Sequence, residues 1–193
     1  MKTQLLLITF IFLLPQCKTV EEDNIIMTVN GPLPAENIGI TLSHEHVLVD
    51  FIGADSTGDH RWEDREVTEV VLPYLRDIKD AGCNTFVECT PEYLGRDVKI
   101  LKALSDSTGM HLLTNTGYYG ARDNMFLPEY AFEETASELA ARWIDEWENG
   151  IAGTEIKPGF IKIGVNRGAL SEVHEKLVRA AAKAHLATGL TIA

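Results

Sequence analysis

Short apolar segments alternate with segments of helical periodicity through most of this chain, and this alternation constrains the fold more than any other feature. The apolar segments have the composition of strands, whereas Val67, Val70, Val71, Leu75 and Ile78 recur at the spacing of one helix face. Each helical segment is long enough to return the chain for a parallel neighbouring strand. The pattern predicts an α/β fold with strands at 40–47, 84–91, 110–116, 159–165 and 189–193, and helices at 67–81, 98–109, 135–149 and 171–188.

The first expected strand ends in Ser43, His44, Glu45 and His46 rather than in the glycine-rich turn of a dinucleotide-binding fold. Functional residues at the carboxyl ends of successive strands are typical of a (β/α)8 TIM barrel, which commonly has about 250 residues. The 193 residues supply about five of the eight strands, because 189–193 has the character of an opening apolar strand. We therefore expect a TIM barrel truncated after about five strands.

His44 and His46 stand two residues apart in an expected strand, and side chains at this spacing point to the same face. They would lie roughly 6.6 Å apart along the strand, so that both rings reach one metal ion at about 2.0–2.1 Å from nitrogen. The alternative interpretation is a strand end with two histidines whose hydrogen bonds are satisfied elsewhere. The pair alone leaves both interpretations open.

Lys162 is unusual because its neighbours Phe160, Ile161 and Ile163 are all apolar, and burial of an unpaired ammonium is costly. Its long stem can instead carry the amine to an interface or an ion pair. Its occurrence together with the histidine pair favours a place in the same site.

Three segments resemble the phosphotriesterase family of the amidohydrolase superfamily. The segment 39–46 resembles the family's first signature, 159–163 resembles the strand with its metal-bridging lysine, and 176–189 resembles the helix that follows. The resemblance extends from about residue 26 to the end of the chain. It implies a TIM barrel with two divalent metal ions at its mouth, and zinc is the expected metal.

The resemblance also implies roles for individual residues. His44 and His46 would bind one metal ion, and Lys162, carboxylated by carbon dioxide, would be the catalytic residue that bridges both ions. The family's remaining ligands, two histidines and an aspartate, would lie on strands beyond Ala193. We therefore expect this chain to hold half of a metal site and to be inactive alone.

Tyr118 and Tyr119 follow the third expected strand, where the family has an aromatic side chain that lines the substrate pocket. Tyrosine there is similar to the lactonase-like and phosphotriesterase-homology branches. The alternative is a tyrosine that packs over the end of the barrel.

For the full-length protein we expect a metal-activated hydroxide that attacks a lactone, a carboxylic ester or a phosphotriester. The alternative is a non-catalytic metal- or ligand-binding fragment.

Glu88 and Asn115 lie near strand ends and are further candidates for the lining of the pocket. His174 falls on an outer helix and is expected at the surface. Cys83 and Cys89 stand at the two ends of one strand, too far apart for a disulfide, and are expected as buried free thiols.

Residues 1–17 are predicted to form a signal peptide, because Lys2 precedes the uninterrupted apolar run 5–14. Cys17 ends this segment in a context that resembles a lipoprotein processing site and would be the lipid anchor. Residues 18–25 are predicted to be a polar tether and 26–193 the barrel domain, in an exported protein that is periplasmic or membrane-anchored.

The net charge of −12 disfavours nucleic acid as a partner. A small-molecule substrate is expected instead and, by the resemblance, a homodimer when the protein is full length.

Overall fold

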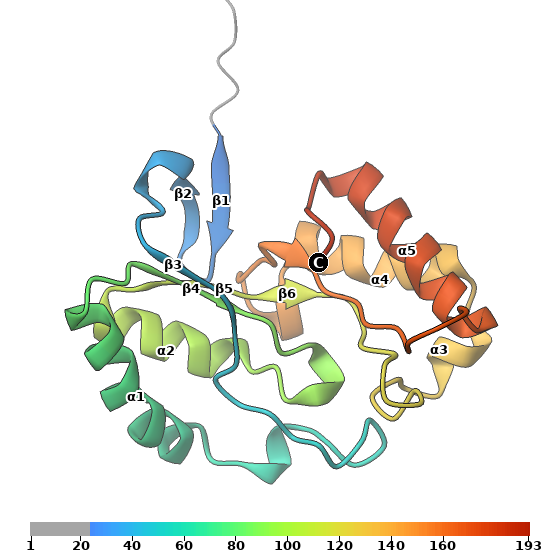
Figure 1. Cartoon of the computed structure of the whole chain (residues 1–193), viewed down its shortest axis with the longest axis horizontal. Helices are drawn as coiled ribbons and strands as arrows, with labels where there is room; N and C mark the ends of the chain where they lie inside the picture. Colours follow the sequence, from blue (N-terminus) through green and yellow to red (C-terminus); the bar gives the residue numbers. More distant parts are fainter. Residues whose placement is uncertain (1–23) are drawn as a thin grey trace, which may run out of the picture.

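A computed structural model describes residues 24–193, and most of them form part of a parallel barrel with helices on its outside (Figure 1). The predicted signal peptide at 1–17, the proposed lipid anchor Cys17 and the tether up to residue 23 lie outside the described residues. Ile25, which the sequence assigned to the tether, already begins a strand. Among the described residues, no helix is both long enough and apolar enough to cross a membrane.

The parallel strands lie in space in the same order as in the chain. β4 (Thr85–Glu88) pairs with β3 (Thr41–Glu45) on one side and with β5 (His111–Leu113) on the other. β6 (Asn115–Thr116) continues from β5 and pairs with β7 (Phe160–Ile161). This order, with a helix outside each crossover, is that of a (β/α)8 barrel and confirms the predicted fold class.

The next strand position is occupied by the last residues of the chain. Ile161 forms a parallel bridge with Ile192, and the backbone N–H of Ala193 donates to the Ile161 carbonyl at 2.8 Å. The segment 189–193 therefore adds to the edge of the sheet, as the sequence predicted. The predicted strand 110–116 divides into β5 and β6 because its partner changes from β4 to β7 at Thr114.

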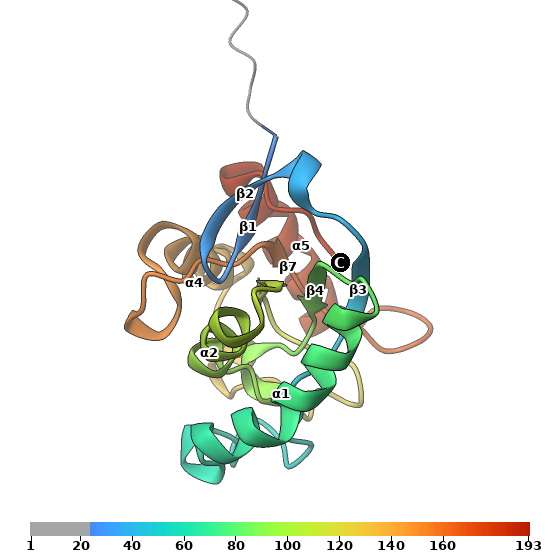
Figure 2. The same ribbon diagram turned by 90° about the vertical axis from the view of Figure 1, so that its left-hand side faces the viewer.

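Four long helices lie around the strands (Figure 2). α1 (Asp64–Asp80) packs against α2 (Val98–Thr108), and α4 (Ala136–Asn149) packs against α5 (Glu172–Thr188). The shorter helices are η1 (Ala35–Asn37), η2 (Asp59–Arg61), η3 (Glu92–Leu94), α3 (Tyr130–Glu133) and η4 (Ile151–Gly153).

Side-chain caps explain where three of the long helices begin. The Asp97 carboxylate accepts hydrogen bonds from the second and third N–H groups of α2, and Ser171 accepts one at the start of α5. Thr135 forms a capping box at the start of α4. Gly109 and Gly189 end α2 and α5 with φ of 66° and 76°, a left-handed conformation that glycine adopts without steric cost.

An antiparallel hairpin that the sequence did not predict lies at the side where the parallel strands begin (Figure 1). It consists of β1 (Ile25–Thr28) and β2 (Gly31–Pro34). The N–H of Val29 in its turn donates to the Leu112 carbonyl of β5 at 2.9 Å. The hairpin therefore covers the amino ends of the strands, away from their carboxyl ends.

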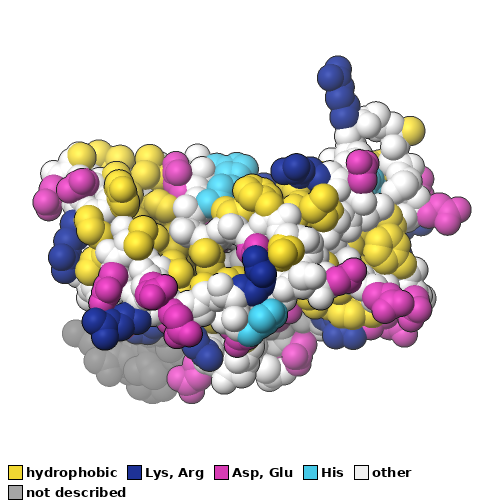
Figure 3. Space-filling model, turned by 90° about the horizontal axis from the view of Figure 1, so that it is seen from below, with side chains coloured by type: hydrophobic (Ala, Val, Ile, Leu, Met, Phe, Trp, Pro, Cys, Tyr) yellow, Lys and Arg dark blue, Asp and Glu magenta, His cyan; other side chains and the backbone are white. Residues whose placement is uncertain are grey.

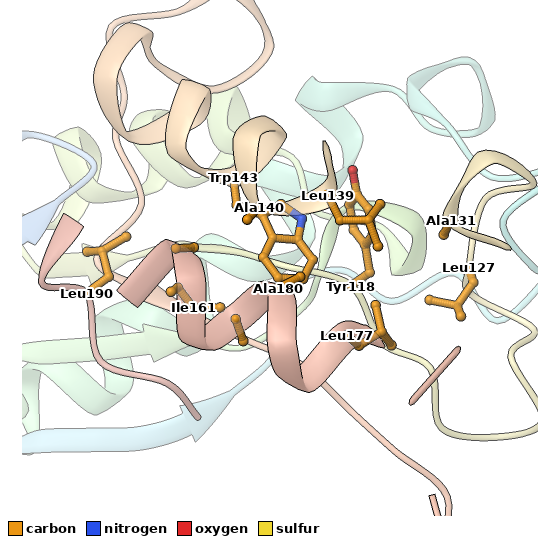
Figure 4. Close-up of a cluster of buried hydrophobic side chains, with 12 residues drawn as sticks. Tyr118, Leu127, Ala131, Leu139, Ala140, Trp143, Ile161, Leu177, Ala180 and Leu190 are labelled. Carbon is orange, nitrogen blue, oxygen red and sulfur yellow. The ribbon is translucent and has the colours of Figure 1, made fainter. Parts of the chain in front are cut away.

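The hydrophobic core lies between the sheet and the helices in two main clusters. The first joins β4 and β5 to α1 and α2 and includes Leu75, Phe86, Ile100, Leu101, Leu104 and Leu112. The second joins β7 to α4 and α5 and includes Tyr118, Leu139, Trp143, Ile161, Leu177 and Ala180 (Figure 4). Burial of these side chains fixes the helices on the outside of the strands.

A buried ion pair connects successive βα units. The Arg96 side chain is only 3% exposed, and its Nη2 donates to Glu146 Oε1 on α4 at 2.5 Å. Its Nη1 donates to Glu146 Oε2 at 3.0 Å and to the Asn115 carbonyl of β6 at 2.6 Å. Glu92 lies 3.7 Å away. The guanidinium is thus fully paired, which burial of a charge requires.

Replacement of Arg96 by Met should lower the free energy of unfolding by about 3–5 kcal/mol, because it leaves the largely buried Glu146 carboxylate unpaired. Urea unfolding measures this loss. Arg65→Met is the matched control, because Arg65 pairs with Glu69 on an exposed helix face, where a pair contributes about 0.5 kcal/mol or less. Equal losses in the two variants would contradict the role assigned to Arg96.

Candidate metal site at the barrel mouth

His44, His46 and Lys162 line one cavity of about 180 Å³. His44 lies in β3, His46 follows β3 and Lys162 follows β7, so that all three stand at the carboxyl ends of parallel strands. The other lining residues are Val49, Phe51, Cys89, Pro91, Leu94, Tyr119 and Phe126. The view from below, where the loops after the strands lie, shows histidine side chains among hydrophobic ones (Figure 3). The structure therefore brings together the three residues that the sequence assigned to one metal site.

A second, larger groove of about 610 Å³ shares part of this lining. His44, Cys89 and Lys162 border both spaces. The rest of the groove is mainly apolar and runs between the hairpin and the last residues of the chain, with Phe160 and Leu190 among its walls. The candidate donors thus stand between a small cavity and a larger open groove, and both spaces are lined mainly by apolar side chains.

The two histidine rings lie close together, with centroids 5.4 Å apart and ring planes at 64°. The pairing register shifts between Leu42 and Glu45, where β3 has one residue more than β4. A bulge of this kind redirects the end of a strand. The predicted regular strand up to residue 47 was therefore wrong, because β3 ends at Glu45 and His46 follows it.

Hydrogen bonds around His46 determine which of its ring nitrogens carries a proton. His46 Nδ1 lies 2.9 Å from Thr90 Oγ1, and the Thr90 hydroxyl donates its only proton to Glu88 Oε1. When Glu88 is ionised, Thr90 therefore accepts a hydrogen bond from Nδ1–H, which leaves the lone pair of the neutral ring on Nε2. An imidazole in this form binds a metal ion through Nε2.

Glu88 and Asn115 support this arrangement but do not line the cavity, which corrects the expectation from the sequence. The Glu88 carboxylate also accepts hydrogen bonds from the N–H groups of Thr90 at 3.1 Å and Val47 at 3.4 Å. Burial raises the pKa of Glu88 to about 7. Asn115 Nδ2 donates to the carbonyls of Glu88 and Thr90, each at 3.1 Å. Both residues therefore fix the end of β4.

The cavity carries an excess of positive charge. Lys162 is half-buried, and its amine has no ion-pair partner among residues 24–193. The pKa of His46 is lowered, first by burial and then by electrostatic interaction with the neighbouring side chains of His44 and Lys162. Burial raises the pKa of the Cys89 thiol, and Cys89 is free, as the sequence predicted. An anionic group bound between these residues would offset the charge.

The donors at the cavity are two imidazoles and one amine. In the described part of the chain, no three histidine, cysteine, aspartate or glutamate side chains converge as a metal cluster. Two neutral imidazoles are a suitable partial donor set for a zinc-like ion, which takes about four ligands. The donors therefore fit a divalent ion that is completed by further ligands.

Tyr119 lines the cavity, but Tyr118 does not. Consecutive residues of an extended chain point to opposite sides. The Tyr118 ring lies 5.3 Å from the Trp143 ring in the core beneath α4, and its hydroxyl lies 2.8 Å from that of Tyr130 (Figure 4). Tyr118 therefore lies in the core and away from the cavity, which favours the packing alternative for this residue, whereas a substrate contact by Tyr119 stays a prediction.

Phe126 is an aromatic wall residue that sequence reasoning missed. It forms an antiparallel bridge with Tyr119, and the two ring centroids lie 6.2 Å apart. The Tyr119 ring packs so closely on Gly164 that a Cβ at that position would overlap it. The loop 120–127 has no periodicity that would have placed Phe126 at the cavity.

His174 also differs from the expectation. It is only 2% exposed, because the first turn of α5 packs on the loop after β6. The sequence predicted a surface residue. Outer helices bury the face that packs on the barrel, and a single histidine does not reveal which face it occupies.

These features define an α/β barrel with two histidines and a lysine around one cavity at its mouth. The model of the phosphotriesterase family matches residues 24–193. The chain belongs to this family, as the resemblance in the sequence had indicated.

Individual relatives support the same assignment. The chain is 34% identical over 155 residues to the phosphotriesterase homology protein of Escherichia coli, covering 80% of this chain and 51% of that protein. It is 31% identical over 160 residues to an aryldialkylphosphatase of Saccharolobus solfataricus, covering 83% and 50%. A mutant organophosphorus hydrolase from Deinococcus radiodurans superposes with a TM-score of 0.75 at 30% identity, covering 87% and 52%. The chain thus spans about half the length of these relatives.

The free energy of unfolding should fall as the pH rises from 4.5 to about 7, because folding raises the pKa of Glu88 from 4.5 to about 7. Within this window the folded state binds more protons than the unfolded state. The stabilisation from Glu88 is therefore fully present below pH 4.5 and is lost as the pH rises through about 7. The difference amounts to about 3 kcal/mol. Urea unfolding across the window should show a flatter profile for Glu88→Gln, which stays neutral. Parallel profiles would contradict the raised pKa.

Proposed function

We propose that the full-length protein is a metal-dependent hydrolase of ester bonds whose metal site includes His44, His46 and Lys162. The observation that carries this proposal is their position around one cavity at the carboxyl ends of the strands. Membership of the phosphotriesterase family, with an aryldialkylphosphatase among the relatives, supports the same class of reaction. Because the chain spans about half the length of these relatives, the proposal concerns the whole protein.

Two divalent ions, with zinc as the expected metal, would be held in part by the ring nitrogens of the histidines and by Lys162. When bound, they would supply Lewis-acid polarisation and activation of water. His46 is prepared for this role, because Thr90 occupies its Nδ1 and leaves Nε2 free. The remaining ligands would come from the part of the protein outside this chain.

Lys162 would act after carboxylation of its amine. The ammonium first releases a proton to solvent. The neutral amine then forms a bond to the carbon of carbon dioxide, an electron pair moves from one C=O bond to oxygen, and the nitrogen releases a second proton to solvent. The product carries a negative charge where the amine carried a positive one, and its two oxygens suit a bridge between two cations. The positive charge of Lys162 contributes to the lowered pKa of His46, and its conversion into a negative charge would remove this unfavourable interaction.

The cavity walls favour a compact, neutral substrate. Phe51, Leu94, Tyr119 and Phe126 contribute apolar surface to the cavity that the histidines and Lys162 also line. An ester would place its carbonyl towards the donors and its hydrocarbon part on the aromatic side. We therefore propose a lactone or a carboxylic ester as the preferred substrate, ahead of a phosphotriester.

Lys162→Arg should reduce kcat/KM of the full-length protein by about 100-fold or more, a barrier increase of about 2.7 kcal/mol. The guanidinium keeps the positive charge but does not form the carbamate. Removal of metal by a chelator should abolish hydrolysis, and added zinc should restore it. Lys183→Arg, at an exposed position of α5, is the matched control. Normal turnover by Lys162→Arg or by metal-free protein would contradict the proposal.

The substrate preference has its own test. A panel of lactones and carboxylic esters should be turned over with a higher kcat/KM than an aryl phosphotriester by the full-length protein. A clear preference for the phosphotriester would remove the proposed substrate class. Absence of hydrolysis on the whole panel, with metal bound, would favour a binding protein instead.

A further inference from the structure

The loop after β6 contains a turn of unusual backbone conformation. Arg122, Asp123 and Asn124 have φ of 59°, 58° and 65°, so three consecutive non-glycine residues are left-handed. The Asn124 N–H donates to the Gly120 carbonyl at 3.2 Å and closes the turn. L-residues rarely form such a turn, because each Cβ crowds the following carbonyl oxygen. Contacts from outside the turn must therefore hold it.

His174 supplies a buried contact to both ends of this turn. Its Nε2 lies 2.9 Å from the Gly120 carbonyl oxygen and 2.8 Å from Asn124 Oδ1. Both partners are acceptors, so Nε2 carries the proton and donates to them. Its Nδ1 is buried without a hydrogen-bond partner among the described residues. The His174 ring therefore contacts the turn through Nε2 while its buried Nδ1 stays without a hydrogen-bond partner. Buried polar atoms are usually hydrogen-bonded, so packing in the core alone does not explain this orientation.

The Gly120 N–H also donates to the Gly164 carbonyl at 2.9 Å, and the remaining contacts of the turn lie nearer the surface. Asn166 exchanges two hydrogen bonds with Asp123, an exposed residue, at 3.3 and 3.0 Å. The Ala54 N–H donates to the Met125 carbonyl at 2.9 Å. Exposed polar contacts compete with water and contribute less to a fixed position than buried ones.

The turn connects the two aromatic residues of the cavity wall. Tyr119 precedes it and Phe126 follows it, and both line the cavity together with His46 and Lys162. A change in the turn therefore moves the wall relative to the metal donors. His174 itself does not line the cavity.

We propose that His174 is a positioning residue that holds the turn at 120–124 and thereby sets the position of the wall formed by Tyr119 and Phe126. The proposal rests on the proposed function, because the wall would select the apolar part of the substrate. It also makes a claim about the turn that is independent of catalysis.

Amide hydrogen exchange of the 193-residue protein tests this claim. His174→Ala should raise exchange in peptides covering 118–127 by about tenfold or more and leave those of α4 unchanged. His174→Gln keeps an N–H donor near the same place and should restore most of the protection. His185→Ala is the matched control, because His185 lies exposed on the same helix and contacts the Leu190 carbonyl.

A second variant tests whether His174 offsets backbone strain. The double variant with His174→Ala and Arg122→Gly should exchange more slowly at 118–127 than His174→Ala alone. Glycine adopts positive φ without a steric penalty, so the turn then needs less support from His174. Unchanged exchange at 118–127 in His174→Ala would overturn the proposal. An equal rise at 118–127 and in α4 would also overturn it, because this would indicate ordinary core packing.

Steady-state kinetics of the full-length protein test whether the turn at 120–124 affects substrate binding at the candidate site. His174→Ala should raise KM for the preferred ester more than it lowers kcat, because the wall binds substrate and does not take part in bond cleavage. A loss confined to kcat would contradict the link to the wall. If the unmodified protein shows no hydrolysis, the proposed function fails, while hydrogen exchange still decides the role of His174.

Discussion

The backbone contact between β6 and Lys162 is the constraint on which the candidate site depends. The Lys162 N–H donates to the Thr116 carbonyl at 2.6 Å, and a Cβ on Gly117 would overlap the Lys162 carbonyl. Gly117 has φ of 108°, which side-chain-bearing residues rarely adopt. This close approach places the amine level with the ends of β3 and β4. Without it, we expect that the lysine would not reach the cavity that the histidines line.

The other side of the cavity is organised by the buried end of β4. Glu88 accepts hydrogen bonds from two backbone N–H groups and from Thr90, and Thr90 in turn orients His46. Asn115 ties the same segment to β6. The buried Glu88 thus lies on the side of β4 that packs on α2, whereas the cavity with Lys162 lies on the other side of β4. An acidic group behind the histidine that it helps to orient suits a site that binds cations.

The sequence was sufficient to predict the fold class and the meeting of His44, His46 and Lys162 at one cavity, because each stands at the end of an apolar segment, and parallel strands bring such ends together. The sequence was insufficient where a shift of one residue along a strand decides whether a side chain points to the core or to the cavity. Tyr118 and Tyr119 are identical in type and adjacent, yet one lies in the core and the other lines the cavity. The bulge in β3 and the buried position of His174 depend in the same way on tertiary packing, which no local pattern records.

Zinc soaked into a crystal of the full-length protein would show whether His44, His46 and Lys162 form one metal site, because anomalous scattering locates the ion independently of the protein atoms. We expect an ion about 2.0–2.1 Å from Nε2 of His46 and from a ring nitrogen of His44, with the Lys162 side chain directed to the same cavity. An ion bound through Nδ1 of His46, or a Lys162 side chain turned outward among the helices, would contradict it.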